Sequence, residues 1–151
     1  MLKASLNDAL KAATKAKEQR KVSTIRLILA ALKDRDLAAG ARYPSEAVGD
    51  EEILELLAKM VRQRRDSIKL YEEGGRVDLA ERETEEIEII EDFMPRQLDN
   101  AEIAAAVKAA IDEVGATGLK DVGRAMAALK ERYAGRMDFA KASMLVKREL
   151  A

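Results

Sequence analysis

Apolar residues recur every three or four positions along most of this chain, which is the period of an amphipathic helix. Ile25, Ile28 and Leu32 fall on one helical face in this way, and Ile53 and Leu57 begin a second such series. No stretch shows the apolar–polar alternation of a strand. The pattern predicts an all-α fold with helices over about residues 5–17, 22–39, 50–73, 78–92, 99–114, 119–133 and 138–151.

Capping residues and helix breakers support these boundaries. Five of the seven expected starts carry a serine or an aspartate, which accept hydrogen bonds from the free N–H groups of a first turn. Asp99 and Glu102 have the spacing of a capping box. Pro44 marks a loop before the third helix, and Gly74–Gly75 ends that helix. The expected capping residues are Ser5, Asp50, Asp78, Asp99 and Asp138.

The run Phe93-Met94-Pro95 ends the fourth helix and opens a linker. We therefore expect two domains with a boundary at Pro95. The first, residues 1–94, is a helical hairpin domain, and the second, residues 95–151, is a small three-helix domain.

Composition narrows the possible chemistry. The chain of 151 residues contains no His and no Cys, which excludes an ordinary zinc site, a Cys–His pair and a Ser–His–Asp triad. We therefore expect no metal, no cofactor and no catalysis by the chain alone. No apolar run approaches the ~20 residues of a membrane span, and the first residues lack the apolar core of a signal peptide. These features favour a cytoplasmic protein without a membrane partner.

Charge divides the third and fourth helices. The third is rich in Lys and Arg, including Arg64, and the fourth is rich in Glu, including Glu86. We expect an antiparallel hairpin with complementary charges, rather than a third helix that binds nucleic acid or a metal site made by the glutamates. Arg26 lies between two apolar residues of the second helix, so we expect it to be half-buried and paired with an acid of the fourth helix.

Positive charge is concentrated in the last part of the chain. Residues 118–151 contain eight Lys or Arg against four Asp or Glu, while the whole chain has a net charge of -1. A local excess of this kind in a small helical domain favours an anionic partner such as RNA. The predicted RNA contacts are Arg124, Lys130, Arg132, Arg136 and Lys141.

Two glycines stand out in the same region. Gly123 lies inside an expected helix, where it costs about 1 kcal/mol relative to Ala, and this suggests close packing of another helix. Gly135 precedes Arg136 and the capping Asp138, so it is expected to form a turn.

Several short segments occur here in an order and spacing that resemble the YqeY family. They are Gln63–Ser67, Gly75–Leu79, Glu86 with Phe93–Pro95, Val122–Met126 and Gly135–Asp138. The resemblance covers nearly the whole chain. It marks Arg64, Arg76, Asp78, Glu86, Pro95, Gly123, Met126, Gly135 and Asp138 as structural motif residues, alongside Arg26.

That family resembles the C-terminal tail domain of the B subunit of glutamine-dependent aminoacyl-tRNA amidotransferase. The resemblance implies two helical subdomains and contact with tRNA, with carbon–nitrogen ligase activity present only by association. The leading hypothesis is therefore a cytoplasmic accessory protein that binds tRNA or structured RNA, with aminoacylation or amidotransferase proteins as further partners. The alternative is a non-catalytic module for protein–protein interaction.

Overall fold

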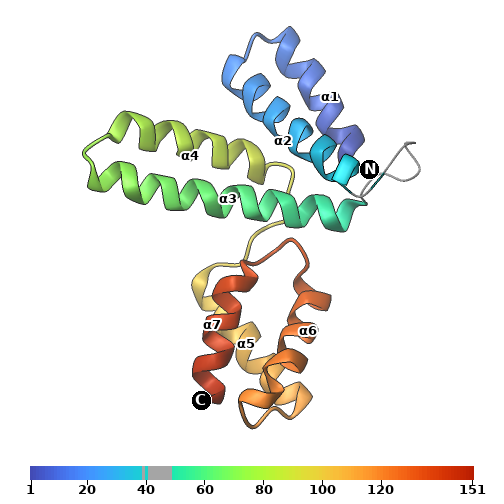
Figure 1. The fold of residues 1–151 in the computed structure, drawn as a ribbon, viewed down its shortest axis with the longest axis vertical. Helices are drawn as coiled ribbons and strands as arrows, with labels where there is room; N and C mark the ends of the chain where they lie inside the picture. The colour runs from blue at the N-terminus through green and yellow to red at the C-terminus, as the bar shows by residue number, and fades with distance from the viewer. Residues whose placement is uncertain (39, 41–48) are drawn as a thin grey trace. The chain divides into compact units, whose positions relative to one another are not determined.

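We describe a computed structural model of the chain over residues 1–38, 40 and 49–151. Every regular element in these residues is a helix, which confirms the predicted all-α fold (Figure 1). The expected loop at Pro44 lies outside the described residues. The elements are α1 (Leu2–Lys15), α2 (Gln19–Ala38), α3 (Asp50–Glu73), α4 (Val77–Glu91), α5 (Asn100–Val114), the 3-10 helix η2 (Leu119–Asp121), α6 (Val122–Tyr133) and α7 (Phe139–Leu150).

The chain divides into two compact units, Met1–Met94 and Pro95–Ala151. In the first unit α3 and α4 run side by side and antiparallel, and α1 and α2 form a second hairpin (Figure 1). Gly75 makes the turn from α3 to α4 with a positive φ of 73°, a conformation that glycine adopts without a steric penalty.

The core of the first unit follows the apolar periodicity of the sequence. Four helices contribute to it, and its side chains exclude water almost completely. Burial of each large aliphatic side chain stabilises a fold by about 1.5–3 kcal/mol, so this cluster is the main force that holds the hairpins together. Its fully buried members are Leu6, Ile25, Ile28, Leu32, Ile53, Leu57 and Ile90.

The second unit packs α5, α6 and α7 around a core that alternates large aliphatic residues with alanine. Val107, Leu129 and Val146 are its largest fully buried side chains. Ala125 and Ala142 are also fully buried, and their small size allows the helices to approach closely. Three helices can therefore form a core in a short segment of chain.

The expected capping residues of α5 and α7, in the second unit, are confirmed, whereas those of α1 and α4, in the first unit, are not. Asp99 and Glu102 form the predicted capping box, and Asp138 caps α7 by accepting from the N–H groups of Ala140 and Lys141. Ser5 does not cap α1, because that helix begins earlier and the Ser5 hydroxyl donates to the Met1 carbonyl. Asp78 likewise lies inside α4, where it pairs with Arg76.

Candidate binding surfaces

Arg124, a predicted RNA contact, is engaged within its own unit. Its guanidinium donates to the Val114 carbonyl at 2.8 Å and pairs with Asp121 at 2.8 Å. Asp121 is buried and also accepts from the Thr117 backbone N–H at 2.9 Å. The hydrogen bond from Thr117 and the pairing with Arg124 lower the pKa of Asp121 to about 2. Arg124 therefore helps to close the turn between α5 and α6.

Arg136 has a similar structural role at the turn between α6 and α7. Its Nε donates to the Arg96 carbonyl at 3.2 Å, and its guanidinium lies 5.8 Å from the centre of the Tyr133 ring. Gln97 donates to the carbonyl of Gly135 at 2.6 Å, and Gly135 has the positive φ, 72°, that a turn requires. These contacts tie the start of the second unit to the turn before α7.

The other three predicted RNA contacts do not join these two in one patch. Lys141 contacts Asn100, and Arg132 pairs with Glu113. Lys130 is exposed near the C-terminal end of α6. Arg124 contacts the C-terminal residue of α5 whereas Lys141 contacts its first residue, about 21 Å away along the helix at 1.5 Å per residue. The positive charges of the second unit are thus spread along its length.

Arg26 does not occupy the half-buried position expected from its apolar neighbours. The buried face of α2 is formed by Thr24, Ile25, Ile28 and Leu32, and Arg26 is rotated away from it and exposed. Arg20, one and a half turns earlier, makes the ion pair between α2 and α4 instead, with Glu85 at 2.6 Å. The prediction that Arg26 pairs with an acid of α4 is wrong.

The charged hairpin of α3 and α4 is confirmed. Arg64 Nε lies 2.9 Å from Glu86 Oε2 and 4.0 Å from Glu83 Oε2, and all three side chains are largely buried. Burial and the charge of Glu86 raise the pKa of Glu83, and Arg64 partly opposes that effect. Arg64, Glu83 and Glu86 therefore form an ion-pair cluster that stabilises the hairpin.

The remaining motif residues serve the local structure in different ways. Arg76 and Asp78 form an exposed pair at the start of α4, and the hydrogen bond from Arg76 lowers the pKa of Asp78. Met126 packs against the second core, and Pro95 is the exposed first residue of the second unit. The expectation that another helix packs closely against Gly123 is wrong, because a Cβ added there would meet nothing within 4 Å.

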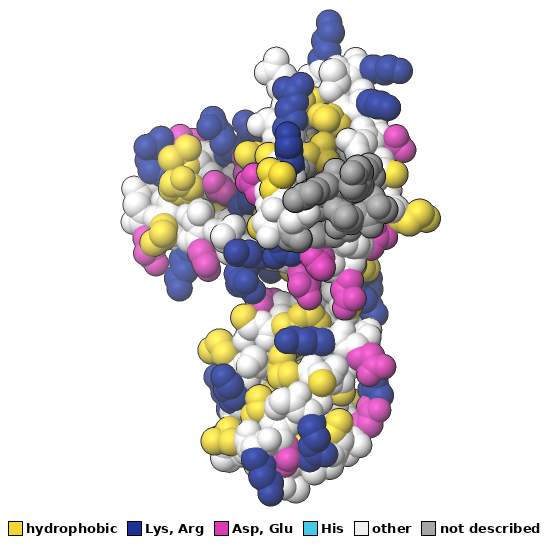
Figure 2. Space-filling model, turned by 45° about the vertical axis from the view of Figure 1, so that its right-hand side comes forward, with side chains coloured by type: hydrophobic (Ala, Val, Ile, Leu, Met, Phe, Trp, Pro, Cys, Tyr) yellow, Lys and Arg dark blue, Asp and Glu magenta, His cyan; other side chains and the backbone are white. Residues whose placement is uncertain are grey.

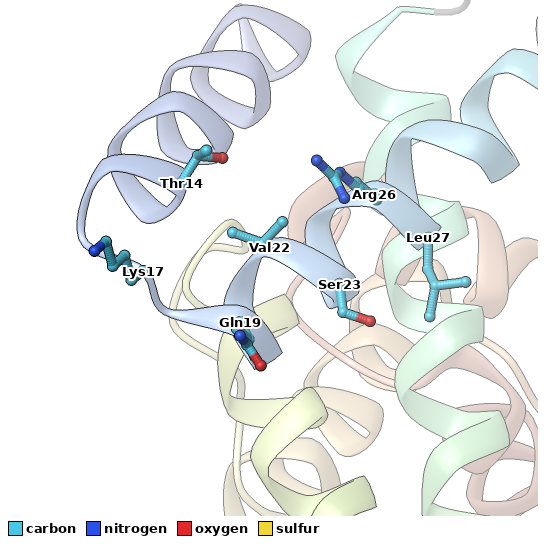
Figure 3. Close-up of a pocket in the computed structure, with 7 residues that line it drawn as sticks. All are labelled: Thr14, Lys17, Gln19, Val22, Ser23, Arg26 and Leu27. Carbon is cyan, nitrogen blue, oxygen red and sulfur yellow. The ribbon is translucent and has the colours of Figure 1, made fainter.

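A groove lies where α1 and α2 meet. It has a volume of about 610 Å³ and is open to solvent. Val22 and Arg26 point from α2 towards α1, where Thr14 faces them, and Lys17 lies at the turn (Figure 3). We call this feature the α1–α2 groove. Its lining residues are Thr14, Lys17, Gln19, Val22, Ser23, Arg26 and Leu27.

The α1–α2 groove combines positive charge with exposed apolar surface. Leu27 is 48% exposed, and Val22 is partly exposed. Neither Lys17 nor Arg26 makes an ion pair or a side-chain hydrogen bond with another described residue, and no acid is among the lining residues. Lys and Arg side chains dominate the end of this unit formed by α1 and α2, at the top of Figure 2. Such a surface can hold an anionic group next to an apolar one.

Sequence reasoning missed this groove. The available signal was that Leu27 falls outside the face defined by Ile25, Ile28 and Leu32, and an apolar residue off the buried face marks exposed apolar surface.

Two kinds of site are absent from the described residues. No helix there combines the length and apolarity that crossing a membrane requires. No group of three or more Asp or Glu side chains in that part of the chain is arranged to hold a metal ion.

Fold and surface together define a small, wholly helical protein of two units, with an open basic groove on the first. Its sequence matches the family described as Yqey-like protein over residues 3–150, and the chain belongs to that family.

Several curated relatives share one name, "Altered inheritance of mitochondria protein 41, mitochondrial". The protein of Lachancea thermotolerans is 34% identical over 74% of this chain and 58% of its own length. That of Clavispora lusitaniae is 38% identical over 62% of this chain and 51% of its own length. That of Kluyveromyces lactis is 33% identical over 60% and 46%. The chain thus spans about half the length of these relatives.

These relatives correct two expectations. They are named as mitochondrial proteins, which contradicts the cytoplasmic location expected from the sequence. Their name refers to inheritance of mitochondria and not to tRNA or an amidotransferase, and this contradicts the predicted role as a tRNA-binding accessory of amidotransferase chemistry. The matches support membership of the Yqey-like family and not the ligase label.

Proposed function

We propose that this chain binds a partner protein through the α1–α2 groove. The observation that carries the proposal is the exposed apolar surface of Val22 and Leu27 in a groove of about 610 Å³. Pockets that receive small molecules are typically concave and about 300–1,000 Å³ in volume, so a groove of this size can receive a side chain of a partner. Binding a partner side chain here would remove Leu27 from water.

The groove also has the rigid support that a binding site needs. Ile25 and Ile28, next to the groove residues on α2, are fully buried in the core of the first unit. At the start of α2, Arg20 also pairs with Glu85 of α4. A preformed surface loses little conformational freedom on binding, so more of the contact energy appears as affinity.

The test compares two exposed leucines. Full-length protein carrying Leu27→Ser, which alters the groove, is compared with Leu70→Ser, which alters a leucine of α3 that is 68% exposed and does not line the groove. Proteins retained from a lysate of the source cells are quantified for each variant, with and without RNase. We expect retention of specific proteins to be lost with Leu27→Ser, kept with Leu70→Ser and insensitive to RNase. Equal retention by the two variants, or loss on RNase treatment, would contradict the proposal.

A further inference from the structure

The α1–α2 groove contains a lysine in an unusual backbone conformation. Lys17 has a φ of 59° and is the only non-glycine residue with a positive φ among those described. Its N–H bonds to the Thr14 carbonyl at 3.2 Å, and the N–H of Glu18 bonds to the Ala13 carbonyl at 3.0 Å. These two bonds form a Schellman motif that ends α1, and the position Lys17 occupies is the one where glycine is usual.

Glycine would relieve the backbone strain at this position, since a side chain is disfavoured at positive φ. Strained residues of this kind cluster at functional sites, where the surrounding structure holds them in place. Lys17 lies at the edge of the groove, at the turn that ends α1, and Arg26 supplies a guanidinium from α2. Both cations lack an internal partner among the described residues.

From this arrangement we infer that the groove binds an acidic segment of the partner protein, whose carboxylates contact Lys17 and Arg26 while neighbouring apolar side chains of the segment pack on Val22 and on Leu27. This inference rests on the proposed function and specifies the partner's chemistry. Charge complementarity selects a negatively charged ligand, because the lining residues include two cations and no acid. The apolar residues favour a protein segment over nucleic acid, since phosphate contacts alone make no use of Leu27.

The cations can act without first losing a bond. In the second unit, Arg124 and Arg136 already donate to carbonyl groups of their own chain, so fewer of their donors are free for a ligand. At the groove, a carboxylate can form charge-assisted hydrogen bonds to Arg26 directly. The stems of Lys17 and Arg26 can also cover apolar surface of the bound segment.

The experiment selects ligands from a random peptide display library, with the full-length chain as bait. We expect the enriched peptides to carry Asp or Glu within a few residues of a large apolar side chain. Their affinity for the chain should fall about three- to tenfold on Arg26→Gln and should weaken as salt is raised. The matched control is Lys33→Gln, which removes one charge from an exposed position on the same helix about two turns further along.

A second variant separates binding from stability. Lys17→Gly removes the cation and the strain together, so we expect the same or a higher melting temperature and at least about threefold weaker peptide binding. A variant that is more stable and yet binds more weakly cannot be explained by unfolding.

The outcomes distinguish this inference from the proposed function. Peptides that lose affinity on Leu27→Ser, but carry no acid and ignore both Arg26→Gln and Lys17→Gly, would refute the acidic partner and leave the groove as a protein-binding site. If no peptide is enriched, or if the enriched peptides are insensitive to Leu27→Ser, both fail. Binding of single-stranded RNA that competes with the peptides and depends equally on Arg26 would overturn the choice of a protein ligand.

Discussion

Arg64 is expected to hold α3 and α4 together, and its removal gives a quantitative test of the structure. Its side chain is only 14% exposed, against 19% for Glu86 and 21% for Glu83. Besides its pairing with Glu86 at 2.9 Å, it donates to the Met60 carbonyl at 3.2 Å. Arg64→Ala would therefore leave two partly desolvated carboxylates facing each other without a cation.

The expected magnitude follows from that burial. Removing one partner of a fully buried ion pair costs about 3–5 kcal/mol. Because the carboxylates remain partly exposed to water, we expect Arg64→Ala to lower the free energy of unfolding by about 2–3 kcal/mol. The matched control is Arg65→Ala, whose side chain is 59% exposed and pairs with Glu91 at 3.4 Å. An exposed pair contributes about 0–1 kcal/mol, so the control should change little.

The assay is urea unfolding followed by far-ultraviolet circular dichroism, because the chain has no Trp to report by fluorescence. A second readout is the dependence of the free energy of unfolding on pH. Burial and the charge of Glu86 already raise the pKa of Glu83, and loss of Arg64 raises it further. A carboxyl with a raised pKa in the folded state binds its proton more tightly there, so Arg64→Ala should regain stability as the pH falls from about 7 towards 5. Equal losses for Arg64→Ala and Arg65→Ala, or a deficit independent of pH, would refute the reasoning.

Three other substitutions test particular environments by thermal unfolding. The hydroxyl of Thr24 is buried without a hydrogen-bond partner among the described residues, so Thr24→Val should raise stability by about 1 kcal/mol, and a lower melting temperature would show that the hydroxyl has a partner. Gly123 has open space around it within α6, so Gly123→Ala should stabilise by about 0.5–1 kcal/mol, and destabilisation would mean that the site is crowded. Asp121 has a folded-state pKa of about 2, below its ordinary value of about 4. The contribution of this carboxylate to folding stability is therefore present above about pH 4 and lost as the pH falls through about 2. We expect the melting temperature of Asp121→Asn to lie below that of the original chain at neutral pH and to converge with it in acid. A difference in melting temperature that stays constant with pH would contradict this.

The fold was predictable wherever the determining interactions are local in sequence. The capping box of Asp99 and Glu102 is a contact between residues three apart, and the cap at Asp138 is equally local. The burial of Ile25, Ile28 and Leu32 follows from helical period alone. These features do not depend on how the helices pack, and for that reason they can be predicted from the sequence.

Side-chain environments were less predictable, because they depend on rotation about a helix and on distant backbone groups. Arg26 has apolar neighbours in sequence, but adjacent residues of a helix lie about 100° apart and do not share a face. Arg124 and Arg136 are held by carbonyl groups of Val114 and Arg96, ten and forty residues away. Any residue can supply a carbonyl, so no sequence pattern reveals these partners.

Because the contacts of a charged side chain are visible only in the structure, the sequence favours a binding site in the second unit whereas the structure favours one in the first. The density of positive charge along the sequence predicts binding by the C-terminal segment, yet Arg124 and Arg136 in that segment are bonded within the fold. A cation that is already bonded to a carbonyl or a carboxylate has fewer free donors to offer a ligand. Lys17 and Arg26 have no such contact among the described residues, and Lys17 keeps its position at the groove despite a strained backbone. Two cations that bond to no other described residue, together with the exposed apolar surface of Leu27, favour the α1–α2 groove as the binding site more than the number of charges does.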